Sequence, residues 1–204
     1  MTVLVAVASR HGATREIADV IGETLGSALA SLDEDAAVDV LFAENAYDLS
    51  DYDAFVLGSA VYNGHWVEAA RDLVERHDRI LRSRPVWLFS SGPARSGALD
   101  GDAAVGSAGG ADGAVDVARQ ARLSAAYQHR LFPGKLDRRR LCFAERAVAG
   151  ALGLRDGDYR DWQAVRAWAR VIASTLHASR APAPASPDLV RCGQWYADTG
   201  TRRP

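Results

Sequence analysis

Short apolar runs alternate with helical patterns along most of the chain. Residues 3–8 form a continuous, valine-rich run, which is typical of a strand buried on both faces of a parallel sheet. Further strands are predicted at 38–42, 54–57, 86–90 and 127–132, and helices at 14–32, 67–82, 115–124, 141–152 and from Asp161, the expected N-cap, onward. This alternation predicts the α/β class, with a doubly wound five-stranded parallel sheet in a three-layer α/β/α arrangement.

Two segments lack this pattern. Residues 92–115 are rich in glycine, alanine and aspartate and poor in large apolar groups, so we expect a long, mobile loop. Residues 178–204 begin with an alanine-, proline- and serine-rich stretch, which favours an extended tail. The sequence therefore predicts one domain over residues 1–177, with an insertion at about 92–115 and a C-terminal tail at 178–204.

Composition narrows the classes of function. The chain has 204 residues and a formal net charge of -2, so no basic excess indicates a nucleic-acid partner. Lys135 is the only lysine, which argues against chemistry that depends on a lysine. Cys142 and Cys192 form no C-x-x-C pair, and the apolar N-terminus lacks a basic leader. The cysteines favour a reducing, cytoplasmic setting. No apolar run is long enough to span a membrane, so we expect no membrane span.

The most specific motif lies between the first predicted strand and the first predicted helix. A strand-to-helix junction exposes backbone N–H groups at the positive end of the helix dipole, which favours bound anions. Hydroxyl groups can add donors to a phosphate, and Gly12 allows close approach of the backbone. An ordinary capped turn is the alternative for this motif alone. The candidate phosphate-binding residues are Ser9, Arg10, His11, Gly12, Ala13 and Thr14.

Two further loops are expected at the same edge of the sheet, where ligands of open α/β folds bind. The loop after residues 54–57 carries Tyr62 and Trp66, whose rings could stack on a planar ligand unless Trp66 simply packs into the core. Gly64 lets a peptide unit turn toward a ring nitrogen. The candidate ring-binding residues are Ser59, Ala60, Val61, Tyr62, Asn63 and Gly64, followed after the fourth strand by Ser91, Gly92 and Pro93.

This arrangement of a phosphate loop and two ring loops resembles the flavodoxin family. The resemblance covers residues 3–91 and implies a flavodoxin-like fold with FMN as cofactor, the first loop holding its phosphate and the other two flanking its ring. Within the family, the stretches 8–14 and 58–65, and more weakly 134–137 and 157–162, are similar to the branch that contains quinone-dependent protoporphyrinogen oxidase. Arg10 strengthens that comparison, because electron-carrier flavodoxins commonly bind the phosphate without a cation.

The resemblance implies an FMN-binding protein of redox chemistry or electron transfer. Its partners would be a redox donor and an acceptor, with a quinone as a candidate acceptor, and possession of an enzyme activity stays open. A different class is a non-catalytic binding or regulatory module that has lost the flavin. Rival folds fit less well, because the chain has no G-x-G-x-x-G after its first strand, no Gly-Lys-Ser/Thr loop, and no carboxylates at the strand ends where a receiver domain needs them.

The arginine run 138–140 adds a candidate interaction surface. It precedes Leu141, Phe143, Val148 and Leu152, so a basic amphipathic stretch could contact an acidic membrane surface peripherally. With Glu145 and Asp156 nearby, an ordinary solvated helix start is the alternative. The histidines at 77 and 129 lie in predicted regular elements without metal-ligand spacing, so we interpret them as packed or surface residues.

Overall fold

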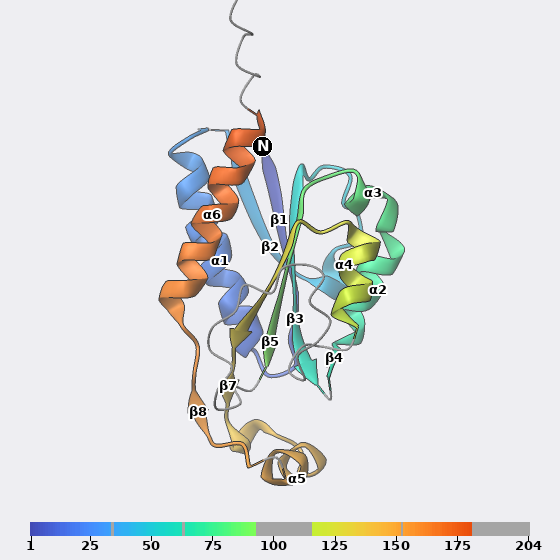
Figure 1. The fold of residues 1–204 in the computed structure, drawn as a ribbon, viewed down its shortest axis with the longest axis vertical. Coiled ribbons are helices and arrows are strands. Elements are labelled where there is room, and N and C mark those ends of the chain that lie inside the picture. The colour runs from blue at the N-terminus through green and yellow to red at the C-terminus, as the bar shows by residue number, and fades with distance from the viewer. Residues whose placement is uncertain (34, 63, 93–115, 152, 181–204) are drawn as a thin grey trace, which may run out of the picture.

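A computed structural model describes residues 1–33, 35–62, 64–92, 116–151 and 153–180. Its sheet contains five parallel strands in the order β2-β1-β3-β5-β6, with the short strand β4 added antiparallel to β3 (Figure 1). This topology confirms the predicted α/β fold with a parallel central sheet. The strands are β1 (Thr2–Ala8), β2 (Ala37–Phe42), β3 (Ala54–Tyr62), β4 (His65–Trp66), β5 (Val86–Gly92) and β6 (Gln128–Pro133).

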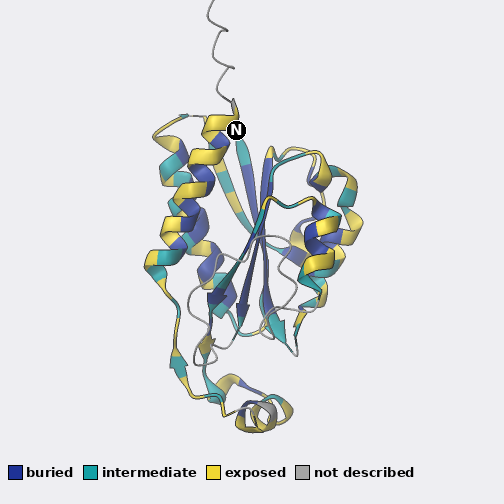
Figure 2. Cartoon of the chain, in the orientation of Figure 1, coloured by how far each residue is buried: buried dark blue, intermediate teal, exposed yellow. Residues whose placement is uncertain are grey.

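Helices cover both faces of the sheet and give the three predicted layers. The helices α1 (Ala13–Ala30) and α6 (Trp162–Arg180) lie on one face, and α2 (Glu68–Arg76), α3 (Asp78–Arg82) and α4 (Val117–Ser124) on the other (Figure 1). Each face has its own apolar core, one centred on Ile21 and Trp168 and the other on Leu57 and Leu73. Figure 2 shows the central strands β1, β3 and β5 buried between these layers, whereas the edge strand β2 is partly exposed. The central strands are therefore accessible only at their ends.

Two predicted elements differ from the structure. Strand β3 continues to Tyr62 instead of ending at residue 57, because Val61 and Tyr62 pair with β4 in a hairpin. The helix predicted over 67–82 is divided at His77, whose backbone (φ -116, ψ 21) departs from helical values between α2 and α3. The candidate ring loop therefore belongs to a β-hairpin formed by β3 and β4, and a two-part helix follows it.

Residues 134–160, which we call the cap, extend beyond the carboxyl ends of the strands (Figure 1). The cap contains β7 (Lys135–Leu136), the 3-10 helix η2 (Arg138–Arg140), α5 (Phe143–Ala151) and β8 (Gly157–Asp158), and β7 pairs antiparallel with β8. The cap begins at Gly134, whose N–H donates to the carbonyl of Gly92 at 2.7 Å. A Cβ at this position would lie 2.9 Å from that oxygen, so the close approach of the two backbones favours glycine. The short strands of the cap were not predicted.

The remaining expectations concern the ends of the domain. Helix α6 continues to Arg180, three residues past the predicted boundary at residue 177. Its start agrees with the sequence, since the Asp161 carboxylate accepts a hydrogen bond from the Ala164 N–H at 2.9 Å. The predicted mobile loop and tail fall almost wholly on residues 93–115 and 181–204, outside the described part of the chain. In the described part, every helix is too short or too polar to cross a membrane.

Candidate functional site

The three segments singled out in the sequence meet at one edge of the sheet. Ala8 pairs with Ser59 across β1 and β3, and Ala60 pairs with Ser91 across β3 and β5. The loop from β1 to α1, the β3–β4 hairpin and the end of β5 therefore lie side by side at the carboxyl edge. The cap borders the same edge (Figure 1).

The start of α1 offers backbone donors to a ligand. Gly12 has a left-handed backbone (φ 86), and no side chain caps the helix. The first bond of the helix runs from the Glu16 N–H to the Gly12 carbonyl, at 3.0 Å. The N–H groups of the three residues before Glu16 have no hydrogen-bond partner among the described residues. Because these donors lie at the positive end of the helix dipole, the loop fits an anion such as a phosphate.

Side chains of the loop support this geometry. The Ser9 hydroxyl accepts a hydrogen bond from the Gly12 N–H at 3.1 Å, which holds the turn and leaves its own proton for another acceptor. Thr14 is only 3% exposed and lies in the first turn of α1. A Cβ added at Gly12 would have no atom within 4 Å, so the backbone is open on that side. The phosphate motif predicted from the sequence is therefore formed as a loop with free donors.

Charged and aromatic side chains surround the mouth of this loop. The Arg10 guanidinium lies 4.8 Å from the centre of the Tyr62 ring, and the His11 ring meets the Tyr62 ring edge-on at 6.1 Å. Glu145 of the cap approaches both residues, 3.8 Å from Arg10 Nη1 and 3.3 Å from His11 Nε2. Burial, with a smaller effect of Glu145, raises the pKa of Tyr62 to about 12, so its phenol is neutral at physiological pH.

The hydrogen bond from the Cys142 N–H lowers the pKa of Glu145, and the bond to His11 adds to this effect. Glu145 is therefore an anion beside the phosphate loop. Arg140 provides a second link, because its Nη1 donates to the His11 carbonyl at 2.9 Å. The cap thus holds the candidate phosphate loop through contacts between residues more than a hundred positions apart.

Arg160 makes the most buried of these links, with only 3% of its side chain exposed. Its guanidinium binds the carboxylates of Asp158 at 2.5 Å and Glu16 at 2.7 Å. It also donates to the Ala13 carbonyl at 3.3 Å and lies 4.4 Å from the centre of the Trp162 ring. The hydrogen bond from Arg160 in turn lowers the pKa of Asp158. Arg160 therefore ties the end of the cap to the first turn of α1.

The candidate residues of the β3–β4 hairpin differ in how far they are buried. Ser59 is fully buried, and its hydroxyl donates to the Ala60 carbonyl at 2.8 Å and accepts from the Val67 N–H at 2.9 Å. Val61, Tyr62 and Gly64 are half-buried near the edge, and Gly64 adopts a positive φ of 79. Asn63 lies outside the described residues. Ser59 therefore anchors the hairpin and α2, whereas Tyr62 and Gly64 border the site.

Of the two roles considered for Trp66, stacking on a ligand and packing into the core, the structure shows the second. Trp66 is only 2% exposed, because the alternation of β4 turns it into the core while His65 points outward. Its indole N–H donates to the Ser90 hydroxyl at 2.8 Å, and that hydroxyl lies 2.8 Å from Nε2 of His129. Burial lowers the pKa of His129 to about 4, so the ring is neutral and accepts the Ser90 proton. His129 is thus a packed residue, as the sequence suggested.

The third candidate loop is only partly described. Ser91 is buried and Gly92 is half-buried at the end of β5, and Pro93 falls outside the described residues. The site residues that the sequence did not identify are Glu145, Arg140 and Arg160. Their positions depend on the cap folding back over the edge, so no local pattern could have identified them. The density of charged residues between positions 135 and 160 is the one signal that the sequence offers, and it does not indicate what those residues contact.

The sheet order and the loop at its first strand define an open α/β protein whose ligand site lies at the carboxyl edge. Residues 4–152 match the model of the flavodoxin domain, and the chain therefore belongs to the flavodoxin domain family. This membership confirms the predicted family and supports FMN as the cofactor.

Solved structures agree on the fold. Oxidised flavodoxin 2 from Bacillus cereus is 20% identical, with a TM-score of 0.55 over 86% of this chain and 99% of that one. The rubredoxin oxygen:oxidoreductase from Desulfovibrio gigas is 14% identical with a TM-score of 0.55, and the match covers 89% of this chain but only 37% of that protein. No curated protein matches the chain significantly. At these identities the likeness concerns the fold alone.

Proposed function

We propose that the protein binds FMN at the carboxyl edge of its sheet and transfers electrons between a donor and an acceptor. The observation that carries this proposal is the start of α1, where backbone N–H groups without described partners adjoin the hydroxyls of Ser9 and Thr14. A phosphate bound there would receive several charge-assisted hydrogen bonds. Ser9 and Thr14 would contribute hydroxyl donors, and the N–H groups after Gly12 the backbone donors.

The hairpin and the end of β5 would hold the flavin ring. In this proposal, residues 59–64 and 91–93 flank the ring, with the neutral phenol of Tyr62 as the aromatic group nearest to the phosphate loop. When bound, FMN supplies the reversible uptake of electrons, which no side chain of the chain needs to provide. Arg10 and His11 belong to the phosphate loop and lie beside the Tyr62 ring, so they would meet the cofactor between its phosphate and its flavin ring.

A narrower proposal concerns the reaction. The resemblance of the motifs to the branch of quinone-dependent protoporphyrinogen oxidase, including Arg10, supports an oxidoreductase that oxidises protoporphyrinogen and reduces a quinone. The six electrons and six protons removed from protoporphyrinogen would reduce three quinones to quinols. Quinones reside in the bilayer, so we also propose peripheral contact with a membrane. We also propose a cytoplasmic location, because the two distant cysteines, Cys142 and Cys192, do not have the pattern of a disulfide framework that is typical of an oxidising compartment.

A second candidate is a flavodoxin-fold module that has lost the flavin. The observation that favours it is Glu145, whose carboxylate approaches Arg10 and His11 at the mouth of the phosphate loop. A resident carboxylate there would compete with a phosphate for the same cationic groups. The two candidates differ in a property that is easy to measure, which is flavin uptake.

Purification separates the candidates directly. The FMN proposal expects a yellow protein whose absorbance bleaches with dithionite, or a colourless protein that quenches the fluorescence of added FMN on binding. A protein that is colourless and leaves the fluorescence of added FMN unchanged would support the module without flavin. Glu145→Gln is a useful companion variant, because flavin uptake by that variant alone would show that the carboxylate excludes the phosphate.

The narrower reaction needs its own assay. Protoporphyrinogen and a soluble menaquinone analogue are added to the flavin-loaded protein without oxygen, and porphyrin fluorescence is followed. The oxidase proposal expects porphyrin to form in proportion to quinol, in the ratio given above. If the flavin-loaded protein forms no porphyrin, electron transfer between other partners remains the function supported.

A further inference from the structure

The outer surface of α5 presents an apolar side chain together with a cation. Phe143 is 87% exposed, the most exposed large hydrophobic residue in the described part of the chain. Arg146, Ala147 and Gly150 follow at three, four and seven positions and are also exposed, so they share its helical face. Glu145 and Ala149, one turn apart and outside this face, are half-buried and buried. The helix therefore packs by one side and turns an unpartnered, partly apolar face outward.

The cap is cationic although the chain is not. It contains seven basic and four acidic residues, a net charge of +3 in a chain whose net charge is -2. Three of the acids form ion pairs, Glu145 with His11 and Arg10, Asp158 with Arg160, and Asp156 with Arg138. The fourth, Asp137, accepts a hydrogen bond from the Arg139 backbone N–H. Arg139 and Arg155, by contrast, are exposed, and their side chains form no hydrogen bond or ion pair with a described residue. The positive charge of the cap is thus directed to solvent.

The position of the cap suits a flat partner. It forms one extreme of the long axis of the described structure (Figure 1), and the helix at its tip is largely exposed (Figure 2). A planar surface can therefore meet α5 without touching the three layers of the domain. An exposed phenyl ring gains little from a charged protein surface, whereas it gains burial in the hydrocarbon boundary of a bilayer. These observations favour a lipid surface over an acidic protein.

We infer that the exposed face of α5, together with Arg139 and Arg155, docks the protein on a bilayer that contains anionic phospholipids. Phe143 enters the boundary between head groups and acyl chains, and the arginines contact the lipid phosphates. The helix is short, so the contact is peripheral and reversible. This inference rests on the membrane contact proposed above and specifies its surface and its lipid class.

Co-sedimentation of the full chain with vesicles tests the docking. We expect binding to vesicles of phosphatidylcholine with phosphatidylglycerol and little binding to phosphatidylcholine alone, with a decrease as salt is raised. Phe143→Ala should weaken the partition roughly tenfold, because the buried ring is lost. The double variant Arg139→Gln with Arg155→Gln should weaken it roughly thirtyfold, at about fivefold for each charge near an anionic surface.

Matched controls lie outside the cap. Tyr47 is 74% exposed, so Tyr47→Ala removes a comparable aromatic ring, and Arg79→Gln with Arg170→Gln removes the same charge from exposed positions on α3 and α6. Both controls should bind like the unmodified chain. Absent or lipid-independent binding, or equal losses in the controls, would show that α5 does not dock on anionic lipid.

Flavin uptake measured on the same samples separates this result from the proposed cofactor. If the chain takes up FMN but binds none of the vesicles, the flavin proposal is supported and the docking on lipid is overturned. An acidic protein is then the partner to test. A chain that binds anionic vesicles through α5 without taking up FMN would keep the docking and overturn the flavin proposal. Circular dichroism establishes that each variant is folded.

Discussion

Thr14 is the residue that most directly tests the phosphate site. Its side chain is buried in the first turn of α1, so Thr14→Val keeps the volume and removes only the hydroxyl. A hydrogen bond to a charged group contributes about 1.5–3 kcal/mol, so we expect FMN to bind roughly ten- to hundredfold more weakly. Fluorescence quenching of FMN during titration measures this change.

Two comparisons make the Thr14 result specific. Thr14→Ser keeps the hydroxyl and should bind FMN nearly as tightly as the unmodified chain. Riboflavin lacks the phosphate, so its binding should be the same for Thr14 and Thr14→Val. Equal FMN affinity of the valine variant would contradict the assignment of this loop to the phosphate.

His129 gives the protein a dependence of stability on pH. Burial lowers its pKa in the folded state to about 4, below the ordinary value of 6.5, so the unfolded chain binds the proton more readily. The contribution of the neutral ring is complete above pH 6.5 and is lost as the pH falls toward 4. At about 1.4 kcal/mol for each pH unit, this residue should lower the free energy of unfolding by about 2 kcal/mol between pH 7 and pH 5.

Urea unfolding at these two pH values measures the effect. His129→Gln removes the titrating ring, so the decrease in the free energy of unfolding between pH 7 and pH 5 should be smaller by about 2 kcal/mol. At pH 7 this variant should be less stable than the unmodified chain, because the Ser90 hydroxyl loses its hydrogen bond to the imidazole. His177→Gln, on the exposed end of α6, is the control and should retain the original dependence. A variant at position 129 with the same pH dependence as the unmodified chain would show that another group is responsible.

At the scale of elements, local periodicity was sufficient for β1, β2, β5, α1 and α6. Their apolar patterns are continuous, and their ends carry recognisable signals such as Asp161. The β3–β4 hairpin was missed, although Asn63-Gly64 between paired residues is a known sign of a two-residue turn. The loop proposed for the phosphate could be recognised because strand, glycine loop and helix are adjacent in sequence.

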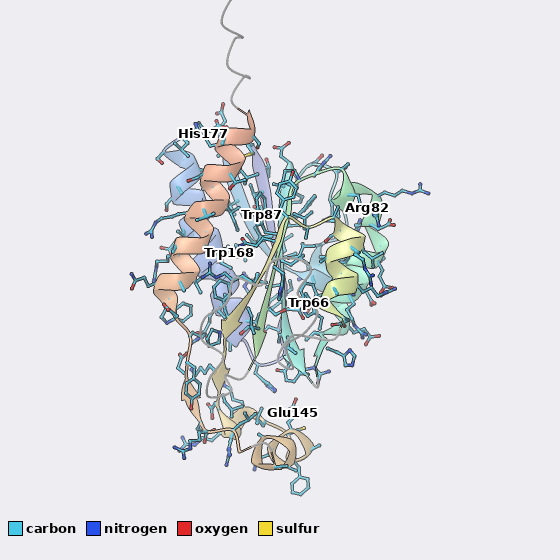
Figure 3. The ribbon with its side chains drawn as sticks, viewed as in Figure 1. Trp66, Arg82, Trp87, Glu145, Trp168 and His177 are labelled. Carbon is cyan, nitrogen blue, oxygen red and sulfur yellow. The ribbon has the colours of Figure 1, made fainter. Side chains whose placement is uncertain are left out.

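The other half of the site could not be found in this way. Glu145, Arg140 and Arg160 reach the phosphate loop across 129 to 147 residues, and only the folded position of the cap brings them there. Figure 3 shows Glu145 in the cap, below the layered domain that contains Trp66, Trp87 and Trp168. Long-range contacts of this kind depend on how the chain folds, and local sequence motifs carry no information about that.

Arg160 leads to a prediction at this scale. Replacing it by glutamine removes the cation that neutralises Glu16 and Asp158, both close to the start of α1. We expect the uncompensated carboxylates to repel the phosphate, so that FMN binds roughly tenfold more weakly while riboflavin binding changes little. Titration of the two ligands gives the ratio of their affinities, which a general loss of packing would leave unchanged.

The neighbouring Arg15 provides the matched control for Arg160. It also lies in the first turn of α1, but it pairs with Asp19 and the Val40 carbonyl on the side of β2. Arg15→Gln should therefore keep the ratio of FMN to riboflavin affinity. If both arginine variants lower that ratio equally, the effect belongs to the charge of the helix as a whole and Arg160 has no special position.

At the scale of the whole molecule, the candidate site depends on folding more than on any single segment. Its three loops follow strands that are separated in sequence and adjacent in the sheet, and the arginine side chains of the cap bind the first of these loops. The unfolded chain therefore has no assembled site. A ligand that binds only the folded state stabilises it in proportion to the logarithm of its concentration.

FMN should consequently raise the melting temperature of the protein. At a concentration one hundred times the dissociation constant, binding adds about 2.7 kcal/mol, which corresponds to a shift of roughly 5–10 °C for a chain of this length. Melting is followed by far-ultraviolet circular dichroism at several FMN concentrations, with inorganic phosphate as the control that engages only the first loop. A shift that grows with FMN and exceeds the phosphate control shows that the whole edge recognises the cofactor. A melting temperature that stays constant up to high FMN concentration would instead indicate that the fold has kept its loops and lost the flavin.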